Sequence, residues 1–186
     1  MHESTVTGAY GAHVAPEEIA PLIIENTEKV FSVMLGLDIR PLPIRVQLSV
    51  EGDGNCILSL LGFAGSWTGA GCFSCTSELA CKISGSMLMS EYQCVNDEVL
   101  DAIGEITNMV IGNFKDAAAP MFGHLALSTP TVIFGRNFRA RNLNGQIWTA
   151  VPFECAGEIF EVKVCLAPTA EPVNSVQRPS LVVSGP

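Results

Sequence analysis

The clearest alternation of apolar and polar positions lies between Asn96 and Lys115. Apolar side chains recur there every three or four residues, and at about 100° per residue they form a single stripe along a helix. Asn96 is a good N-cap, Lys115 suits the negative C-terminal end, and Pro120 is expected to prevent simple continuation. The pattern therefore predicts a helix that buries this stripe, which consists of Val99, Ile103, Ile106, Val110 and Phe114.

The opposite side of this helix carries an unusual mixture of polar and small residues, namely Asp97, Asp101, Gly104, Glu105, Asn108, Gly112 and Lys115. A carboxylate and an amide, Glu105 and Asn108, stand one turn apart on it. Glycine costs about 1 kcal/mol in a helix interior, so two glycines on an exposed face indicate that another backbone or a partner protein comes close. We therefore expect the function of the chain to reside on this face.

Similar periodicity predicts two more helices. One spans residues 16–35 and has Gly36 as its stop signal, with Pro21 as an alternative start. The other spans residues 78–89 and is capped by Ser77.

Strands are expected where β-branched and aromatic residues cluster between turn signals. The glycine-rich segment Glu51–Asn55 predicts a turn, and Pro130 is expected to mark a bulge or a sheet edge. The predicted strands are Ile44–Val50, Cys56–Phe63, Gly69–Thr76, Leu125–Phe134, Gln146–Pro152 and Gly157–Cys165.

The order of these elements predicts an α+β fold with a mostly antiparallel β-sheet and long helices packed on one face. A helix followed by strands occurs twice, in residues 16–76 and 96–165, which hints at a duplicated unit. We expect a single domain over residues 16–166. A flexible leader (1–15) is expected before it, and a tail rich in proline and serine (167–186) after it.

Composition narrows the function classes. An apolar fraction of 48% indicates a folded protein. Nineteen acidic and ten basic residues give a net charge of −9, which argues against nucleic acid and anionic membrane surfaces as partners. No apolar run reaches the roughly eighteen residues that a membrane span needs, and the N-terminus does not resemble a secretory signal. A cytoplasmic protein is therefore expected.

Seven cysteines and three histidines raise a metal or redox alternative. Cys72-Phe-Ser-Cys75 has the spacing of a zinc or redox motif, but no second pair follows it, and His2, His13 and His124 are scattered. Structural zinc sites more often combine two close pairs of ligands. Buried thiols without a metal are the favoured interpretation, and a cysteine-based ligand or redox sensor stays open as an alternative.

The segment Asp101-Ala-Ile-Gly-Glu105-Ile-Thr-Asn108 resembles the signature of the CheC/CheX family of chemotaxis phosphatases, and the CheX branch most closely. That signature is an acidic residue or serine, three residues, Glu, two residues and Asn, with a proline further on. Met109–Lys115, Ser128–Gly135 and Leu61–Leu88 fit the same family, so the resemblance covers about residues 16–166.

Two departures from the family pattern matter. Pro130 lies one residue nearer to Asn108 than the usual spacing. CheC proteins carry the Glu/Asn pair twice, whereas Ile24–Lys29 in the first predicted helix contains no Glu followed by Asn three residues later. A single active site is therefore expected, as in CheX.

The resemblance implies that the chain hydrolyses the aspartyl phosphate of a receiver domain such as phospho-CheY. The receiver supplies Mg²⁺ in such reactions, so no cofactor is expected in this chain. Asn108 would orient the attacking water, Glu105 would pair with the receiver's lysine, and Asp101 would support docking. Independently of the family, we expect Gly104 and Gly112 to keep the surface low so that the partner can approach.

A non-catalytic interaction module is the main alternative, because the family is also similar to the middle regions of flagellar-switch proteins. The exposure of Glu105 and Asn108 discriminates between the two, since a catalytic pair must reach a partner. A homodimer is expected as well. CheX-like proteins pair through a sheet edge, and Leu125–Phe134 has no evident edge protection.

Overall fold

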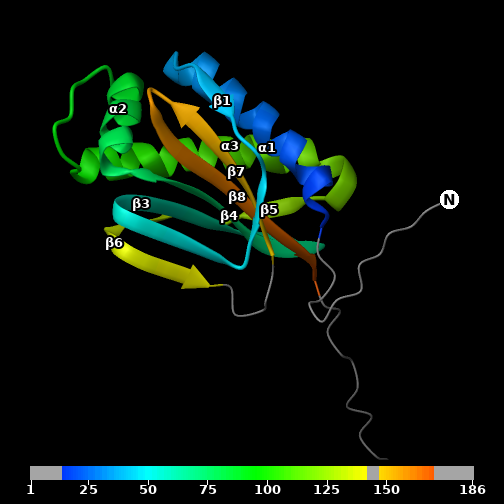
Figure 1. Cartoon of the computed structure of the whole chain (residues 1–186). Coiled ribbons are helices and arrows are strands. Elements are labelled where there is room, and N and C mark those ends of the chain that lie inside the picture. The colour runs from blue at the N-terminus through cyan, green and yellow to red at the C-terminus, as the bar shows by residue number, and fades with distance from the viewer. Residues whose placement is uncertain (1–13, 142–146, 170–186) are drawn as a thin grey trace, which may run out of the picture.

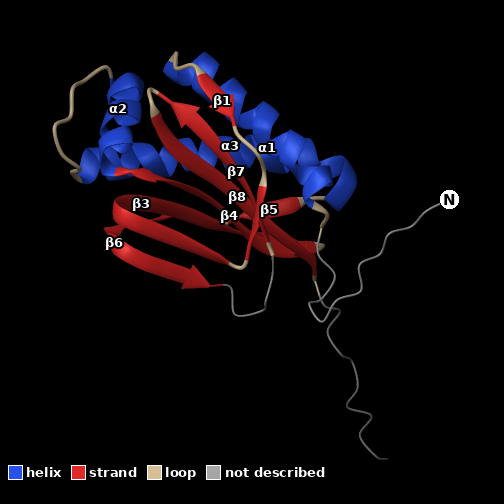
Figure 2. Ribbon diagram, viewed as in Figure 1, coloured by secondary structure: helices blue, strands red, loops and turns tan. Residues whose placement is uncertain are grey.

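Three helices lie on one face of an eight-stranded sheet (Figures 1 and 2). The structure, a computed structural model, describes residues 14–141 and 147–169. Its helices are α1 (Pro16–Val30), continued by a π-helical segment (Phe31–Leu35), α2 (Ser77–Leu88) and α3 (Asp97–Phe122). Its strands are β1 (Ile39–Pro41), β2 (Arg45–Gln47), β3 (Ser49–Gly65), β4 (Trp67–Thr76), β5 (Leu125–Leu127), β6 (Thr131–Arg141), β7 (Trp148–Cys155) and β8 (Glu158–Pro168). The predicted α+β class is confirmed.

The sheet is antiparallel, with the strand order β1-β7-β8-β4-β3-β5; β2 pairs with β7 and β6 pairs with β3. The two halves of the chain meet where β4 pairs with β8 at the centre. The outer strands of each half pair with the other half. β1 and β2 of the first half pair with β7, and β5 and β6 of the second half pair with β3. Exchanging the two halves reproduces the same order, which supports the duplicated unit that the sequence suggests.

The main core lies between this sheet and the helices. The predicted apolar stripe of α3 is buried along its whole length, from Val99 to Phe114. At the other end of the layer, the ring of Phe160 stacks on three others, with centroid distances of 4.6 Å to Phe31 and 5.1 Å to both Phe73 and Phe153. This stack anchors the end of α1 to strands β4, β7 and β8.

Three predictions about the strands are wrong in detail. The predicted turn at Glu51–Asn55 lies inside the long strand β3, where the pairing with β6 shifts register between Gly52 and Asn55. Gly54 has φ +65°, and its N–H donates to Asn137 Oδ1 at 3.0 Å, so the irregularity is a bulge rather than a reversal. The strands predicted at residues 44–50 and 125–134 are each divided, by Leu48 and by residues 128–130.

The helix ends also differ from the predictions. The helix predicted over residues 16–35 is confirmed, since α1 starts at Pro16 and its π-helical continuation ends at Leu35 before Gly36, and only the alternative start at Pro21 is wrong. The cap of α2 is Thr76 instead of Ser77, since Thr76 Oγ1 accepts a hydrogen bond from the N–H of Leu79 at 3.1 Å. α3 does not stop near Lys115 but continues through Pro120, because the buried residues Ala118 and Phe122 extend its apolar stripe and outweigh the hydrogen bond lost at the proline.

The domain boundaries need small corrections. Val14 is buried in the core although it was assigned to the leader, and β8 runs to Pro168, two residues beyond the predicted domain end. The rest of the predicted leader and tail, residues 1–13 and 170–186, lies outside the described residues. Within residues 14–141 and 147–169, no helix is long and apolar enough to cross a membrane.

Candidate functional site

The first turn of α3 is built as the sequence predicts. Asn96 caps the helix, with its Oδ1 accepting a hydrogen bond from the N–H of Val99 at 3.0 Å. Asp97 and Glu98 occupy the first turn, where negative charge stabilises the positive end of the helix dipole. The buried stripe then fixes the rotation of α3 on the sheet, so that Asp101, Glu105 and Asn108 on the opposite side face solvent.

Glu105 and Asn108 are both exposed on that outer side. Neither side chain is hydrogen-bonded or ion-paired to another described residue. Residues three apart on a helix are neighbours on its surface, so the carboxylate and the amide project together. Asp101 is also exposed, one turn before Glu105. The structure therefore brings together the three polar residues selected from the sequence and leaves them free to contact a partner.

The two glycines of this face behave differently. A Cβ atom on Gly112 would have no atom within 4 Å, so this glycine lies open, as predicted. Gly104 is buried, and a Cβ atom there would lie 3.3 Å from Val132 Cγ2 and 4.0 Å from Pro130 Cβ. The prediction that Gly104 offers open surface to a partner is wrong, because the side chains of Val132 and Pro130 from the same chain lie against it.

The site lies on an exposed helix face. A groove of about 740 Å³ lies between α2, the segment 90–95 and Phe134, but neither Glu105 nor Asn108 lines it. Small-molecule sites are concave and bury most of their ligand. A carboxylate and an amide that are exposed on a helix surface are instead suited to entering a cavity that a partner macromolecule provides.

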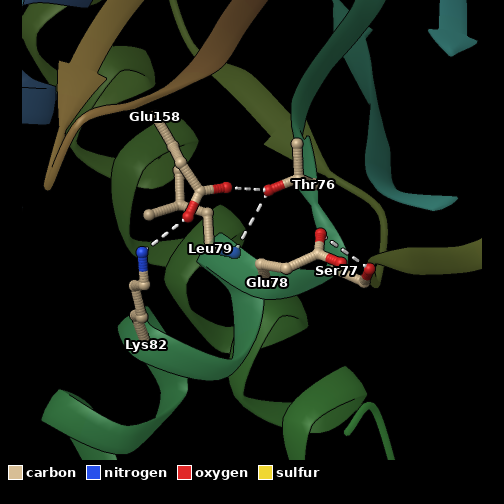
Figure 3. A network of polar contacts seen from close by, with 6 residues as sticks. All are labelled: Thr76, Ser77, Glu78, Leu79, Lys82 and Glu158. Atoms are coloured by element: carbon tan, nitrogen blue, oxygen red, sulfur yellow. Dashed lines mark hydrogen bonds and ion pairs between the residues drawn. The ribbon is translucent and has the colours of Figure 1, made fainter. Parts of the chain in front are cut away.

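A polar network that sequence reasoning missed holds α2 in place (Figure 3). Glu158 on β8 accepts hydrogen bonds from Thr76 and, at 2.7 Å, from Lys82 Nζ. Partial burial alone would raise the pKa of Glu158, but the hydrogen bonds from Lys82 and Thr76 and the charge of Lys82 together lower it. No local pattern could reveal this network, because Glu158 lies 76 residues from Lys82 in the sequence.

Helix α2 in turn supports the candidate site helix. The Oγ of the buried Ser84 on α2 donates to the backbone oxygen of Val99 in the first turn of α3, at 3.4 Å. The network at Glu158 therefore does not include Glu105 or Asn108. It holds α2 to β8, and α2 in turn contacts the first turn of α3.

All seven cysteines lie in the described residues, none of them forms a disulfide, and all but Cys94 are buried. Burial raises the pKa of Cys72 to about 12, so this thiol is protonated and unreactive at neutral pH. In the part of the chain that the structure describes, no group of three or more His, Cys, Asp or Glu side chains is placed to hold a metal ion.

Comparison with known proteins assigns the fold to one protein family. Residues 57–154 match the family described as chemotaxis phosphatase CheX. This match includes more than half of the chain, so the protein belongs to the CheX family.

Solved structures agree with this assignment. CheX from Desulfovibrio desulfuricans is 28% identical with a TM-score of 0.72, over 81% of this chain and 99% of that one. A chain in the CheX-CheY-BeF3-Mg²⁺ complex of Borrelia burgdorferi is 20% identical with a TM-score of 0.63, over 80% of this chain and 97% of that one, and shares the fold.

A curated relative is the CheY-P phosphatase CheX of Thermotoga maritima, which is 29% identical over 89 residues. The aligned region is 47% of this chain and 57% of the relative. The chain thus spans a little over half the length of the curated relative that it matches.

Proposed function

We propose that this chain is a phosphatase that hydrolyses the aspartyl phosphate of a CheY-like receiver domain. The observation that carries the proposal is the joint exposure of Glu105 and Asn108 on the outer side of α3, without partners among the described residues. The family assignment and the name of the Thermotoga maritima relative support the same reaction class.

In this mechanism the catalytic task of Asn108 is to hold a water molecule in line with the phosphorus–oxygen bond that breaks. An amide offers both a donor and an acceptor, so it can orient water without placing negative charge beside an anionic phosphoryl group. Most of the rate enhancement in phosphoryl transfer comes from positioning and charge stabilisation, and the receiver supplies its own Mg²⁺ for the latter. Attack by the water transfers the phosphoryl group from the aspartate to form inorganic phosphate.

Glu105 would anchor the complex by pairing with the lysine of the receiver, which sets the depth at which Asn108 enters the partner's pocket. Asp101, one turn earlier, would add a second contact to the docking surface, and the open position of Gly112 would let the partner approach the helix. Because the net charge is −9, attraction to an often acidic receiver has to act locally rather than over long distances.

The direct test is phosphate release from each phosphorylated receiver of the source organism, with and without the chain. The expected result is faster dephosphorylation of at least one receiver, and loss of that acceleration in Asn108→Ala. A receiver that binds tightly but is dephosphorylated equally fast by both proteins would instead favour the non-catalytic interaction module, which is the alternative that the sequence leaves open.

We also propose a homodimer that forms through the outer edge of β6. This strand pairs with β3 on one side, and it exposes Ile133 and Phe134 to 38% and 49%. The first half of the strand, Thr131 to Gly135, carries no charge, whereas Arg136, Arg139 and Arg141 follow in the second half. An uncharged edge segment is a template for pairing with a second chain. Light scattering should report a dimer that Ile133→Lys converts to a monomer, while Ile159→Lys, at a similarly exposed position on β8, leaves it intact. A monomeric wild-type chain at high concentration would contradict the proposal.

A further inference from the structure

Helix α3 lies directly against the edge strand β6 at Gly104. The residue is buried although it belongs to the polar side of the helix, and Val132 and Pro130 are its neighbours. A distance of 3.3 Å from an added Cβ atom to Val132 Cγ2 is shorter than ordinary van der Waals contact. Any side chain at this position would therefore displace Val132 by a few tenths of an ångström, and where the packing holds Val132 in place it would push the helix and the strand apart or rotate the helix.

Gly104 is also the residue immediately before Glu105 and one turn before Asn108. A shift of the backbone at Gly104 must move both side chains relative to the sheet, because the helix between them is rigid. We propose that Gly104 is a positioning residue: its missing side chain lets α3 rest on β6 and so sets the depth and rotation at which Glu105 and Asn108 project. The proposal rests on the proposed phosphatase function and extends it to a residue that contacts no substrate.

The contrast with Gly112 separates this role from simple exposure. Both glycines belong to the same side of α3, and each weakens the helix by about 1 kcal/mol relative to alanine. At Gly112 no described atom lies within 4 Å of an added Cβ, so packing inside the chain does not explain why a helix-weakening glycine stands there. We expect Gly112 to make room for the partner instead. At Gly104 the explanation is the contact with β6, which lies inside the chain.

The test compares Gly104→Ala, Val132→Ala and the double variant in the receiver dephosphorylation assay. Because a misplacement of 1 Å can cost about 100-fold, a shift of a few tenths of an ångström in Gly104→Ala should lower kcat by roughly three- to ten-fold and leave KM almost unchanged. Val132→Ala removes the methyl group that the new Cβ would meet, so the double variant should regain the kcat of Val132→Ala alone. Gly112→Ala serves as the comparison for a docking effect and should raise KM instead.

A second measurement excludes a purely structural explanation. The helix propensity that alanine gains over glycine offsets the close contact with Val132, so Gly104→Ala should change the unfolding temperature little even though it lowers kcat. The side-chain amide signal of Asn108 in a ¹⁵N correlation spectrum should shift in Gly104→Ala and return toward its original position in the double variant. This measurement needs no receiver.

The outcomes distinguish the two proposals. If the wild-type chain accelerates dephosphorylation of no receiver, the phosphatase proposal fails, and the Asn108 signal alone decides whether Gly104 positions the pair. An unchanged kcat in Gly104→Ala, or a loss that Val132→Ala does not repair, would overturn the positioning role while leaving the phosphatase proposal intact.

Discussion

Helices α1 and α3 hold equivalent places in the two halves of the molecule (Figure 1). A glycine with positive φ ends both, with φ +63° at Gly36 after the π-helical continuation of α1 and +74° at Gly123 after α3. Each is followed by a three-residue edge strand, a short connection that contains a proline, and a second edge strand. Aligning the two glycines, 87 residues apart, also aligns Pro43 with Pro130. The duplicated scaffold therefore extends from the helices into the edge strands.

The same alignment places Glu18 opposite Glu105 and Pro21 opposite Asn108. Glu18 and Pro21 are exposed, as their counterparts are. α1 thus has a carboxylate at the position equivalent to Glu105 but has a proline ring without donor or acceptor where α3 has the amide of Asn108. The comparison teaches that the scaffold is shared, whereas the proposed chemistry depends on one side chain. A single active site accordingly stays a prediction, and its test lies at positions 18 and 21.

The largest expected effect is on the free energy of unfolding and comes from the aromatic contacts that hold the ends of the two helices to the sheet. Phe160 stacks on three rings and ties the end of α1 to the sheet, whereas Phe122 at the end of α3 packs against Trp67 with centroids 5.0 Å apart. Phe160→Ala should lower the free energy of unfolding by about 3–5 kcal/mol. Phe122→Ala should cost less because its ring has fewer aromatic neighbours. Chemical denaturation measures the loss of unfolding free energy in both variants. A larger loss in Phe122→Ala than in Phe160→Ala would show that the aromatic stack is not the stronger anchor.

The comparison is tested most directly by removing Asn108 and its counterpart. Asn108→Ala should reduce receiver dephosphorylation by about 100-fold, which is typical for the loss of one group that acts in the transition state. Pro21→Ala should leave the rate unchanged and stabilise α1, because proline inside a helix is unfavourable. Equal losses of activity in the two variants would mean that α1 takes part in the reaction.

The two glutamates offer a smaller contrast. Glu105→Ala should raise KM by about ten-fold, or about 1.4 kcal/mol, with a smaller effect on kcat, because the lost ion pair anchors the receiver. Glu18→Ala should change neither constant, since no amide accompanies it on α1. Receiver binding can be measured by titration with the activated receiver. If Glu18→Ala weakens it, α1 also contacts the receiver, although α1 has no amide equivalent to Asn108.

The smallest expected effect is the loss of stability when the polar network that supports α2 is weakened at Glu158. The pKa of Glu158 in the folded protein lies below its ordinary value of 4.5, so its stabilising contribution is complete above that pH and is lost as the pH falls through the folded pKa. Glu158→Gln should cost at most about 1 kcal/mol at pH 7, because the Lys82 partner is largely exposed. Unfolding midpoints of the two proteins should converge below pH 4.5. A difference that persists in acid would contradict the ionic origin of the effect.

Much of the fold follows from local patterns in the sequence. The stripe from Val99 to Phe114 and the cap at Asn96 identify α3, because helical periodicity and capping are local properties. The exposure of Glu105 and Asn108 follows from the same periodicity. The end of α3 at Phe122 was missed because tertiary packing outweighs the local effect of Pro120.

What the sequence could not reveal depends on contacts between distant segments. Gly104 and Val132 are 28 residues apart, and their contact exists only because β6 folds back beside α3. The sequence predicts a turn where β3 has its bulge, since a glycine-rich segment has the same local pattern in both cases. The ion pair of Lys82 with Glu158 likewise arises from the sheet order.

The exchange of outer strands makes each half of the chain a structural part of the other. A fragment that stopped before α3 would leave the outer edge of β3 without β5 and β6, and would also remove β8 from beside β4. The half that contains α1 therefore cannot be discarded even though it lacks the amide. Its contribution is mechanical, since β1 and β2 close the far side of the sheet on which the other half depends.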